Sequence, residues 1–260
     1  MIATADILSA RGISKSHLDS RSGHQVEALR DVSVNVGHHE FVSVIGPSGC
    51  GKSTFLRVVA GLDRPSAGEI IVAGKRVSRP GADRGMVFQE YALLPWKTTQ
   101  KNIEFGPLLK GMAKAERAEI ARRFIALVGL TGAEHKYPHQ LSGGMRQRAA
   151  VARALANNPA ILLMDEPFAA VDAMTRQRLQ EELAAISATE RTTVLFVTHA
   201  IEEAVFLSDR VVVLSGKPGR VVADIRIDLE RPRRWDQLTR QGRFADYCAE
   251  LTRHLSGTPS

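Results

Sequence analysis

The chain has 260 residues, of which 44% are hydrophobic and 24% are charged. This is the composition of an ordinary globular protein, and it argues against intrinsic disorder, collagen and coiled coil. No apolar run approaches the roughly 18 to 20 residues that cross a bilayer, and the first residues do not read as a secretory signal. Two cysteines are too few for a disulfide framework or a four-ligand zinc site, so we expect a reducing, cytoplasmic setting.

The net charge of +7 favours an anionic partner, such as a nucleotide, a nucleic acid or a phospholipid surface. The basic residues are scattered along the chain rather than gathered in one tract. The densest run, Arg231-Pro-Arg-Arg234, is predicted to form a solvated turn rather than a nucleic-acid patch.

Short apolar runs alternate with helical stretches, which is the pattern of an α/β protein with a largely parallel sheet. The sequence has no internal repeat and no low-complexity linker, so we expect one compact body. In chain order we predict short antiparallel strands within residues 1–40, a buried strand at 40–46, a helix at 52–61, short antiparallel strands within 69–87, helices between 98 and 158 with breaks at 129–132 and near Pro138, buried strands at 160–164, 193–197 and 210–214, and a helix at 236–255.

A glycine-rich loop lies between the predicted strand at 40–46 and the predicted helix at 52–61. It fits the pattern GxxxxGK[ST], whose glycines let backbone N–H groups point at phosphate oxygens beside the positive end of a helix. We expect Lys52 to reach the β- and γ-phosphates and the Ser53 hydroxyl to ligate Mg²⁺. The predicted nucleotide-binding residues are Gly46, Pro47, Ser48, Gly49, Cys50, Gly51, Lys52, Ser53 and Thr54.

Two carboxylates follow a second buried strand, in Ile161-Leu-Leu-Met-Asp-Glu166. Ligands of open parallel sheets bind at the carboxyl ends of the strands, which places this pair beside the phosphates. Asp165 is suited to hold Mg²⁺, and Glu166 to polarise an attacking water as general base. The loop alone indicates a nucleotide, whereas the loop and the acidic strand end together predict NTP hydrolysis.

A third motif, Leu141-Ser-Gly-Gly-Met-Arg-Gln-Arg148, starts a helix with the N-cap residue Ser142 and two glycines, Gly143 and Gly144, that expose backbone N–H groups. This segment resembles the LSGGQ signature of ABC ATPases, with Met145 in place of the usual Gln. In that family the helix end contacts the γ-phosphate held by a second subunit. The resemblance therefore implies a homodimer that sandwiches two ATP molecules.

Further family elements follow in order. By resemblance, Gln89 matches the glutamine that contacts Mg²⁺ and the attacking water, Asp172 matches the aspartate loop at the dimer interface, and His199 matches the switch histidine that contacts the γ-phosphate. The aromatic residue that stacks on adenine aligns with His17, whose imidazole offers less area. The residues so implied are Glu166, His199 and Gln89 for catalysis, Ser53, Gln89 and Asp165 for the metal, and His17, Ser142, Gly143, Gly144 and Asp172 for the nucleotide.

The resemblance covers about residues 5–230 and implies a P-loop ABC ATPase core with a mostly parallel sheet, an antiparallel β subdomain and a helical insert at about 92–158. Residues 231–260 are expected to form a short C-terminal helical tail.

A finer resemblance links the chain to the ATP-binding subunits of nitrate, sulfonate and taurine importers. It implies an ATPase with ATP and Mg²⁺ as cofactors, docked on transmembrane permease subunits at the cytoplasmic face of the inner membrane as a peripheral protein, with a periplasmic substrate-binding protein as an indirect partner. Related importers of bicarbonate, cyanate or thiamine precursors share much of this pattern, so the assignment of a substrate rests on analogy alone. The segments concerned are Leu93-Leu-Pro-Trp96, Tyr137-Pro-His-Gln140, Met164-Asp-Glu-Pro-Phe168 and Val213-Leu-Ser-Gly-Lys-Pro-Gly-Arg220.

Two other classes of function stay open at this point. One is a soluble ABC ATPase acting on nucleic acid or ribosomes, which the net charge of +7 supports. Such proteins typically carry two cassettes or a long coiled-coil insertion, and this sequence has neither, so no nucleic-acid partner is expected. The other is a non-catalytic nucleotide-binding module, which the presence of Glu166 and His199 disfavours.

Overall fold

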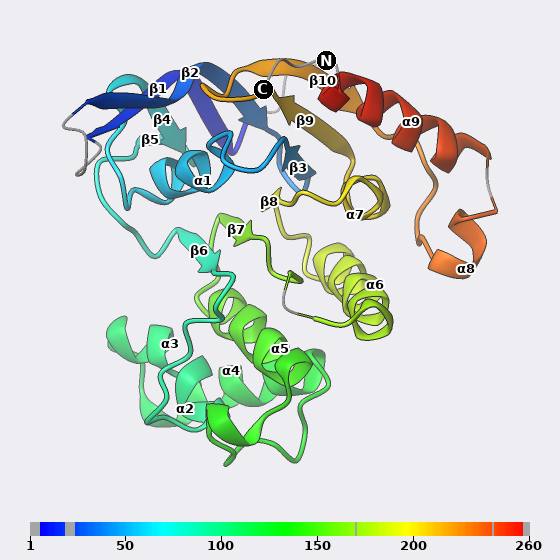
Figure 1. Cartoon of the computed structure of the whole chain (residues 1–260). Coiled ribbons are helices and arrows are strands. Elements are labelled where there is room, and N and C mark those ends of the chain that lie inside the picture. The colour runs from blue at the N-terminus through cyan, green and yellow to red at the C-terminus, as the bar shows by residue number, and fades with distance from the viewer. Residues whose placement is uncertain (1–5, 19–23, 170, 241, 257–260) are drawn as a thin grey trace, which may run out of the picture.

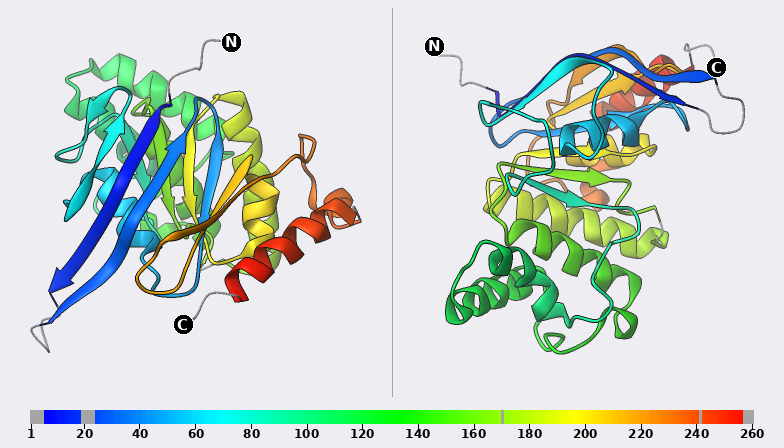
Figure 2. Two further views of the ribbon diagram at one scale, coloured as in Figure 1. Left: turned by 90° about the horizontal axis from the view of Figure 1, so that it is seen from above. Right: turned by 90° about the vertical axis from the view of Figure 1, so that its left-hand side faces the viewer.

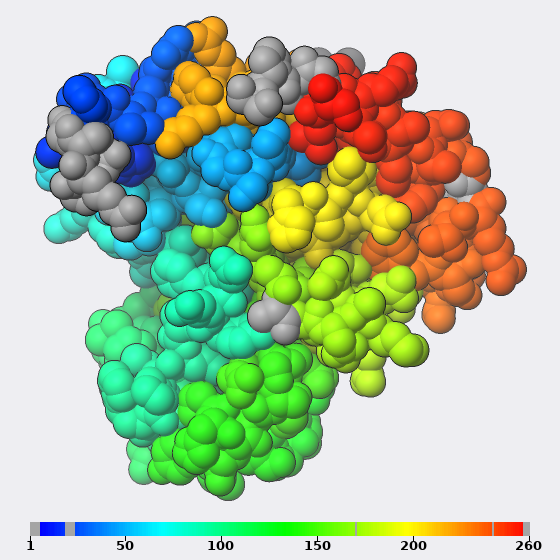
Figure 3. Space-filling model, viewed as in Figure 1, coloured from blue at the N-terminus to red at the C-terminus, as the bar shows by residue number. Residues whose placement is uncertain are grey.

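The computed structural model describes residues 6–18, 24–169, 171–240 and 242–256. Figure 1 shows a β-rich half that contains two sheets and a helical half built from the middle of the chain. The helical half protrudes as a lobe of its own in the space-filling view (Figure 3).

The main sheet has six strands in the order β10-β9-β3-β8-β7-β6. Neighbours from β9 to β6 run parallel, and β10 is antiparallel to β9. All residues of β3 and β8 are buried, as expected for strands covered on both faces. The four predicted buried strands are confirmed. The strands are β3 (Phe41–Ile45), β6 (Arg84–Val87), β7 (Ile161–Asp165), β8 (Val194–Val197), β9 (Arg210–Leu214) and β10 (Val221–Arg226).

A second sheet is antiparallel, in the order β2-β1-β4-β5. The sequence predicts antiparallel strands here, which is confirmed, but it predicts short ones, whereas β1 has 11 residues and β2 has 12. The strands are β1 (Leu8–Leu18), β2 (Gln25–Val36), β4 (Ala67–Val72) and β5 (Lys75–Arg76).

The antiparallel assignment is wrong for β6, which belongs to the main sheet and pairs parallel with β7. Val87 lies opposite Met164, and Arg84 lies opposite Ile161. The direction follows from the connection, because the chain between these two strands is the long helical insert. A parallel pair needs a crossover of a dozen or more residues, and the insert supplies one.

The insert contains five short to medium helices, which Figure 2 shows at the end of the molecule opposite the antiparallel sheet. The predicted breaks are confirmed: one helix ends two residues before Gly129, whose φ is 64°, and Pro138 starts a separate 3₁₀ turn. The helices are α2 (Thr99–Ile103), α3 (Phe105–Leu109), α4 (Lys114–Leu127), the 3₁₀ helix η1 (Pro138–Gln140) and α5 (Gly143–Leu155).

Helices cover both faces of the main sheet and divide the core in two. Alternate residues of β3 point to opposite faces, so Val42 and Val44 join the core under α1 (Lys52–Ala60), while Phe41 and Ile45 join the core on the other face. That second face is covered by α5, α6 (Ala173–Thr189) and α7 (Ile201–Leu207). Figure 1 shows α1 between the two sheets.

The single tail helix predicted at 236–255 is wrong in its continuity, because the structure has α8 (Trp235–Leu238) and α9 (Gly242–Ser256) instead. The Trp235 ring stacks on Phe206 at 4.4 Å and meets the edge of Phe244 at 6.0 Å. In one continuous helix, residues nine positions apart lie on opposite faces. Trp235 and Phe244 can therefore meet only if the helix is interrupted between them.

The basic run before α8 is also not the solvated turn that the sequence predicts. Arg233 is buried, at 5% exposure, and its guanidinium donates to five backbone carbonyls around the end of α7 and after β10. Arg231 pairs with Asp209 near the surface, and Arg234 is exposed. A charge run can thus contain a buried member when enough acceptors surround it.

Within the described ranges, no helix is both long enough and apolar enough to cross a bilayer. Cys50 and Cys248 are both free thiols.

Candidate functional site

The glycine-rich loop follows β3 and leads directly into α1, as the sequence predicts. Gly49 and Gly51 have φ values of 77° and 100°, which L side chains rarely adopt. A Cβ on Gly51 would also lie 2.7 Å from the Ala28 carbonyl oxygen of β2, so the loop packs tightly against the antiparallel sheet. No side chain caps α1, so its first backbone N–H groups stay available to an anion.

Lys52 is buried within this loop, at 5% exposure. Its Nζ donates to the carbonyl oxygens of Gly46 and Pro47, at 2.9 and 3.0 Å. These bonds hold a positive charge inside the curl of the loop, where a phosphate group would be attracted. Cys50 is buried in the same loop, and burial raises the pKa of its thiol, so it is unsuited to redox chemistry.

Ser53 and Asp165 meet at the carboxyl end of the sheet. The Ser53 hydroxyl donates to Oδ1 of Asp165 at 2.8 Å, which joins α1 to the end of β7. Burial raises the pKa of Asp165, and the neighbouring charge of Glu166 raises it further. A hydroxyl and a carboxylate side by side are the hard oxygen ligands that Mg²⁺ prefers, and a cation would relieve the cost of the buried charge. The two residues present here therefore fit a magnesium ion.

Glu166 and His199 form a second pair beside the first. Nδ1 of His199 lies 2.9 Å from Oε2 of Glu166, with the two side chains 63% and 22% exposed. Glu166 has a φ of 42°, and its N–H donates to the Val197 carbonyl at 2.9 Å. The carboxylate at this turn lies against His199, two residues after the end of β8. The pair presents a carboxylate and an imidazole to solvent at the same edge as the loop.

Gln89 follows β6, the strand next to β7, so it lies at the same edge of the main sheet. Its side chain is exposed, and the structure gives it no hydrogen bond to Asp165 or Glu166, both of which it describes. The fold thus places Gln89 at the carboxyl edge of the main sheet, but without a hydrogen bond to Asp165 or Glu166.

Ser142 and Asp172 each begin a helix, and the two helix starts lie together. Ser142 caps α5 by accepting from the Met145 N–H at 3.3 Å, and Asp172 caps α6 by accepting from the Thr175 N–H at 3.0 Å. That bond lowers the pKa of Asp172. A Cβ on Gly144 would lie 3.3 Å from the Thr175 side chain. Ser142 and Asp172 are both exposed, and Figure 1 shows α5 in the helical half, away from the phosphate loop of the same chain before α1.

His17 lies near the far end of β1, paired with Val26 of β2. Its side chain is exposed, and Val26 precedes by two residues the Ala28 carbonyl that touches the phosphate loop. His17 is therefore on the sheet beside the loop.

The sequence analysis missed one residue next to this site. Glu203, in the first turn of α7, is buried at 5% exposure and receives a 2.7 Å hydrogen bond from Gln180 of α6. Its neighbour Glu202 is exposed. The signal available in the sequence was the apolar run that follows, because Phe206 and Leu207, three and four residues after Glu203, are buried and lie on the same side of the helix as Glu203.

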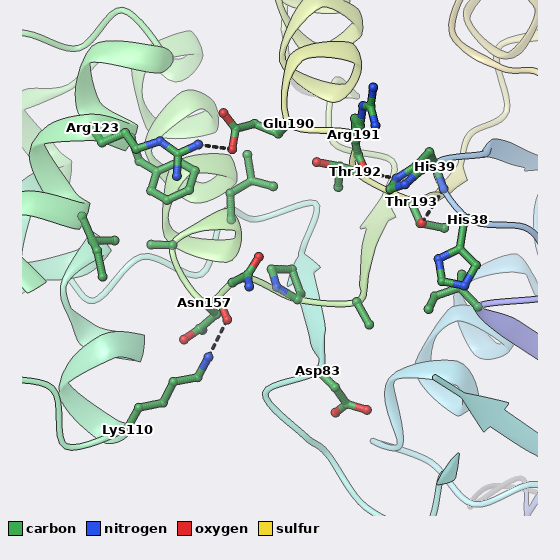
Figure 4. Close-up of a pocket in the computed structure, with 18 of the residues that line it drawn as sticks. His38, His39, Asp83, Lys110, Arg123, Asn157, Glu190, Arg191, Thr192 and Thr193 are labelled. Atoms are coloured by element: carbon green, nitrogen blue, oxygen red, sulfur yellow. Dashed lines mark hydrogen bonds and ion pairs between the residues drawn. The ribbon is translucent and has the colours of Figure 1, made fainter. Parts of the chain in front are cut away.

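A cavity of about 760 Å³ lies at the opposite, amino edge of the main sheet. Figure 4 shows His38 and His39 before β3, Asp83 before β6 and Thr193 before β8, facing Arg123 and Lys110 of the insert. Arg123 pairs with Glu190 at 2.5 Å, and Lys110 donates to the Asn157 carbonyl. Since ligands of such sheets bind at the carboxyl edge, this cavity is separate from the site around Lys52.

Comparisons with known proteins agree with this geometry. The family model described as ABC transporter matches residues 29–169. The chain is 58% identical, over 82% of its length and 79% of the relative's, to an uncharacterised ABC transporter ATP-binding protein of Methanocaldococcus jannaschii. It is 46% identical, over 89% of both chains, to a nitrate import ATP-binding protein of Synechocystis sp..

The fold is also similar to that of a solved ATP-binding cassette, a dimer in a post-hydrolysis state bound to ADP and Pi. The TM-score is 0.73 and the identity is 32%, over 86% of this chain and all of that one. The phosphate loop, the two acids at the end of β7 and the helical insert thus occur in a chain whose sequence and fold both resemble those of ATP-binding cassettes. The chain therefore belongs to the ABC transporter family and is an ATPase built on the ATP-binding cassette fold of that family.

Proposed function

We propose that the chain is the energy-coupling ATPase of an importer for a small anion, with nitrate, a sulfonate or taurine as the substrate. The observation that carries this proposal is the 46% identity to a nitrate import ATP-binding protein over 89% of both chains. That similarity favours nitrate among the three. The described residues around Lys52 are suited to ATP, so we assign recognition of the anion to partner subunits.

In the proposed mechanism each residue of the site has one task. Lys52 supplies a fixed positive charge for the β- and γ-phosphates of ATP. Bound Mg²⁺ would neutralise charge on the phosphate oxygens, and Ser53, Asp165 and Gln89 are the residues that would hold it. Glu166 accepts a proton from the attacking water as general base. His199, 2.9 Å from Glu166, keeps that carboxylate oriented and contacts the γ-phosphate.

Two copies of the chain would complete each site. Ser142, Gly143 and Gly144 begin a helix whose free N–H groups suit a phosphate, yet they lie in the helical half, away from the phosphate loop of their own chain. This separation favours contact with ATP on a second copy, with Asp172 at the same interface. The similarity to a cassette dimer bound to ADP and Pi supports the arrangement.

The proposed partners are transmembrane permease subunits, with a periplasmic substrate-binding protein acting through them. The chain would then be a peripheral protein at the cytoplasmic face of the inner membrane. Large apolar side chains on the surface of the insert support such a contact: Trp96 is 71% exposed and Leu109 is 72% exposed. We further propose that residues 5–230 form the ATP-binding domain, with the insert at about 92–158, and that 231–260 form a short C-terminal helical tail; residues 5, 241 and 257–260 lie outside the described ranges.

The test is hydrolysis in the assembled transporter. The chain is purified together with the permease subunits that co-purify with it from its native membrane and is placed in lipid nanodiscs. Hydrolysis is then assayed with a substrate-binding protein carrying nitrate, taurine, an alkanesulfonate or bicarbonate. We expect one small anion to stimulate hydrolysis, and only through its binding protein. Stimulation of the isolated chain by RNA or ribosomes, without stimulation in nanodiscs, would replace this proposal by the soluble class of ATPase.

A further inference from the structure

A buried carboxylate links the helix that begins at Asp172 to the helix that follows His199. Glu203 of α7 is 5% exposed and Gln180 of α6 is 2% exposed, and Nε2 of Gln180 donates to Oε1 of Glu203 at 2.7 Å. Burial raises the pKa of Glu203. Burying a carboxylate costs desolvation free energy, and the four residues after Glu203 are apolar. Packing alone would therefore favour an apolar side chain at this position.

Glu203 also acts on the residues that flank His199. Hydrogen bonding from Thr198 favours the charged form of Glu203, and the Thr198 oxygen accepts from the Ala200 N–H at 3.0 Å. A carboxylate can only accept, so it orients the Thr198 hydroxyl proton toward itself and leaves the Thr198 oxygen free for Ala200. Thr198, His199 and Ala200 line one cavity together with Glu203, so the backbone on both sides of His199 lies beside this carboxylate.

The other side of Glu203 faces the start of α6. Arg176 lies one turn before Gln180, its guanidinium donates to the Val171 carbonyl at 2.9 Å, and its charge lowers the pKa of Glu203. A cavity of about 30 Å³ is lined by Glu166 and His199 together with Arg176 and Glu203. Glu166 and His199 therefore line the same cavity as Arg176 and Glu203.

We propose that Glu203 is a positioning residue for ATP hydrolysis: through Gln180 and Thr198 it holds His199 where His199 contacts Glu166. The inference rests on the roles proposed above for Glu166 and His199. It predicts that loss of the acceptor at this position lowers turnover without changing how ATP binds, because Lys52 and Ser53 are untouched.

The test replaces Glu203 by Met, which keeps the length and removes the acceptor. We expect kcat to fall about 10- to 100-fold, the range for small misplacements of a reacting group, with KM for ATP unchanged. Glu202→Met is the matched control, since Glu202 is exposed on the same turn, and it should leave kcat unchanged. Melting temperature is recorded for each variant, and Glu203→Met should melt no lower than the control.

A conservative variant separates positioning from packing. In Glu203→Gln the amide oxygen can still accept from Thr198, and its NH₂ can donate to Oε1 of Gln180, a buried atom with no hydrogen bond among the described residues. We therefore expect Glu203→Gln to regain most of the kcat that Glu203→Met loses. The ¹⁵N resonances of the His199 ring should shift in Glu203→Met and stay in place in Glu203→Gln.

Should Glu203→Met fail to fold, Gln180→Met removes the same link from α6 and should show the same fall in kcat. A kcat in either folded variant equal to that of Glu202→Met overturns the inference, as does a loss in Glu203→Met that Glu203→Gln does not restore. His199→Ala distinguishes a failure of the proposed role of His199 from a failure of the inferred role of Glu203. If His199→Ala hydrolyses ATP normally, the proposed role of His199 fails, whereas a dead His199→Ala beside an active Glu203→Met removes the role of Glu203 alone.

Discussion

The Ser53 hydroxyl donates a 2.8 Å hydrogen bond to Oδ1 of Asp165, joining the start of α1 to the end of β7 across 112 positions of sequence. The pKa of Asp165 is nevertheless raised, because burial outweighs the favourable bond from Ser53. The folded chain thus holds this carboxylate against its own stability, which is typical of a residue kept for binding or catalysis.

Replacing Asp165 by Asn should raise the free energy of unfolding at neutral pH while lowering ATP hydrolysis. Because the pKa of Asp165 is higher in the folded chain, its favourable contribution is full below the ordinary titration range of a carboxyl group and is lost as pH rises through the raised pKa. Asn cannot ionise, so the variant should lack this loss. Urea unfolding from about pH 4 to 7 compares the two chains.

The control for that experiment is Asp63→Asn. A hydrogen bond from Arg57 lowers the pKa of Asp63, so its contribution is present above the ordinary carboxyl range and lost as pH falls. This variant should therefore be less stable than the original chain at neutral pH, the opposite sign. The same sign for both variants would contradict the burial argument for Asp165.

Replacing Glu166 by Gln should leave ATP binding intact and lower steady-state hydrolysis by about 10²- to 10⁴-fold, the usual contribution of a general base. The amide keeps the shape of the side chain and removes the basic oxygen. Because ATP would stay bound between two copies, the variant should accumulate as a dimer with ATP and Mg²⁺, which size-exclusion chromatography measures. Near-normal turnover would remove Glu166 from its proposed role.

Replacing Lys52 by Ala should weaken ATP binding itself. The variant removes the charge that the Gly46 and Pro47 carbonyls hold inside the loop. Calorimetric titration with ATP measures the affinity, and far-ultraviolet circular dichroism checks the fold. An unchanged affinity in a folded variant is incompatible with phosphate binding by this loop.

Replacing Ser142 by Arg tests whether two chains share each site. The bulky cation lies at the start of α5, away from the phosphate loop of its own chain, so ATP binding by a monomer should survive. Closure of a second copy over the ATP should fail, so hydrolysis and ATP-driven dimer formation should fall together. Each is measured on the same preparation.

Mixed dimers sharpen this test. Chains with Ser142→Arg are combined with chains with Lys52→Ala, each also carrying Glu166→Gln to arrest turnover. If a site combines the loop of one chain with the signature of the other, one of the two sites in a mixed dimer is intact and should trap ATP. Trapping no higher than in either parent dimer would count against shared sites.

Replacing Arg233 by Met should lower the free energy of unfolding by at least about 3 kcal/mol, because five carbonyl acceptors lose a buried charged donor. Burial lowers the pKa of Arg233 to about 10, and the charge of Asp209 offsets only part of this effect, so the direct hydrogen bonds that stabilise the buried guanidinium are those to the carbonyls. Urea unfolding measures the change. Arg234→Met, at an exposed neighbour, should change stability by less than about 0.5 kcal/mol. Equal effects of the two substitutions would show that the buried network is not what stabilises the tail.

The sequence by itself determined the parts of this protein whose signal is local. The loop from Gly46 to Ser53 is recognisable because a positive φ favours glycine at Gly49 and Gly51, and at Gly51 close packing against Ala28 also leaves no room for a Cβ. The strands β3, β7, β8 and β9 are recognisable because burial on both faces favours a nearly continuous apolar run. Asp165 and Glu166 stand out because they are two acidic residues that directly follow the apolar run of β7.

Only the tertiary structure decided which polar residues are buried and which strands are neighbours. Glu203 and Arg233 are of the same types as their exposed neighbours Glu202 and Arg234, and what separates them is the set of partners that the fold delivers from distant segments, such as Gln180 to Glu203. The direction of β6 likewise depends on the crossover through the insert. Local patterns report a residue's own preference for burial, whereas hydrogen bonds to a buried charge come from residues far along the chain, so the free energy that permits its burial exists only once the chain is folded.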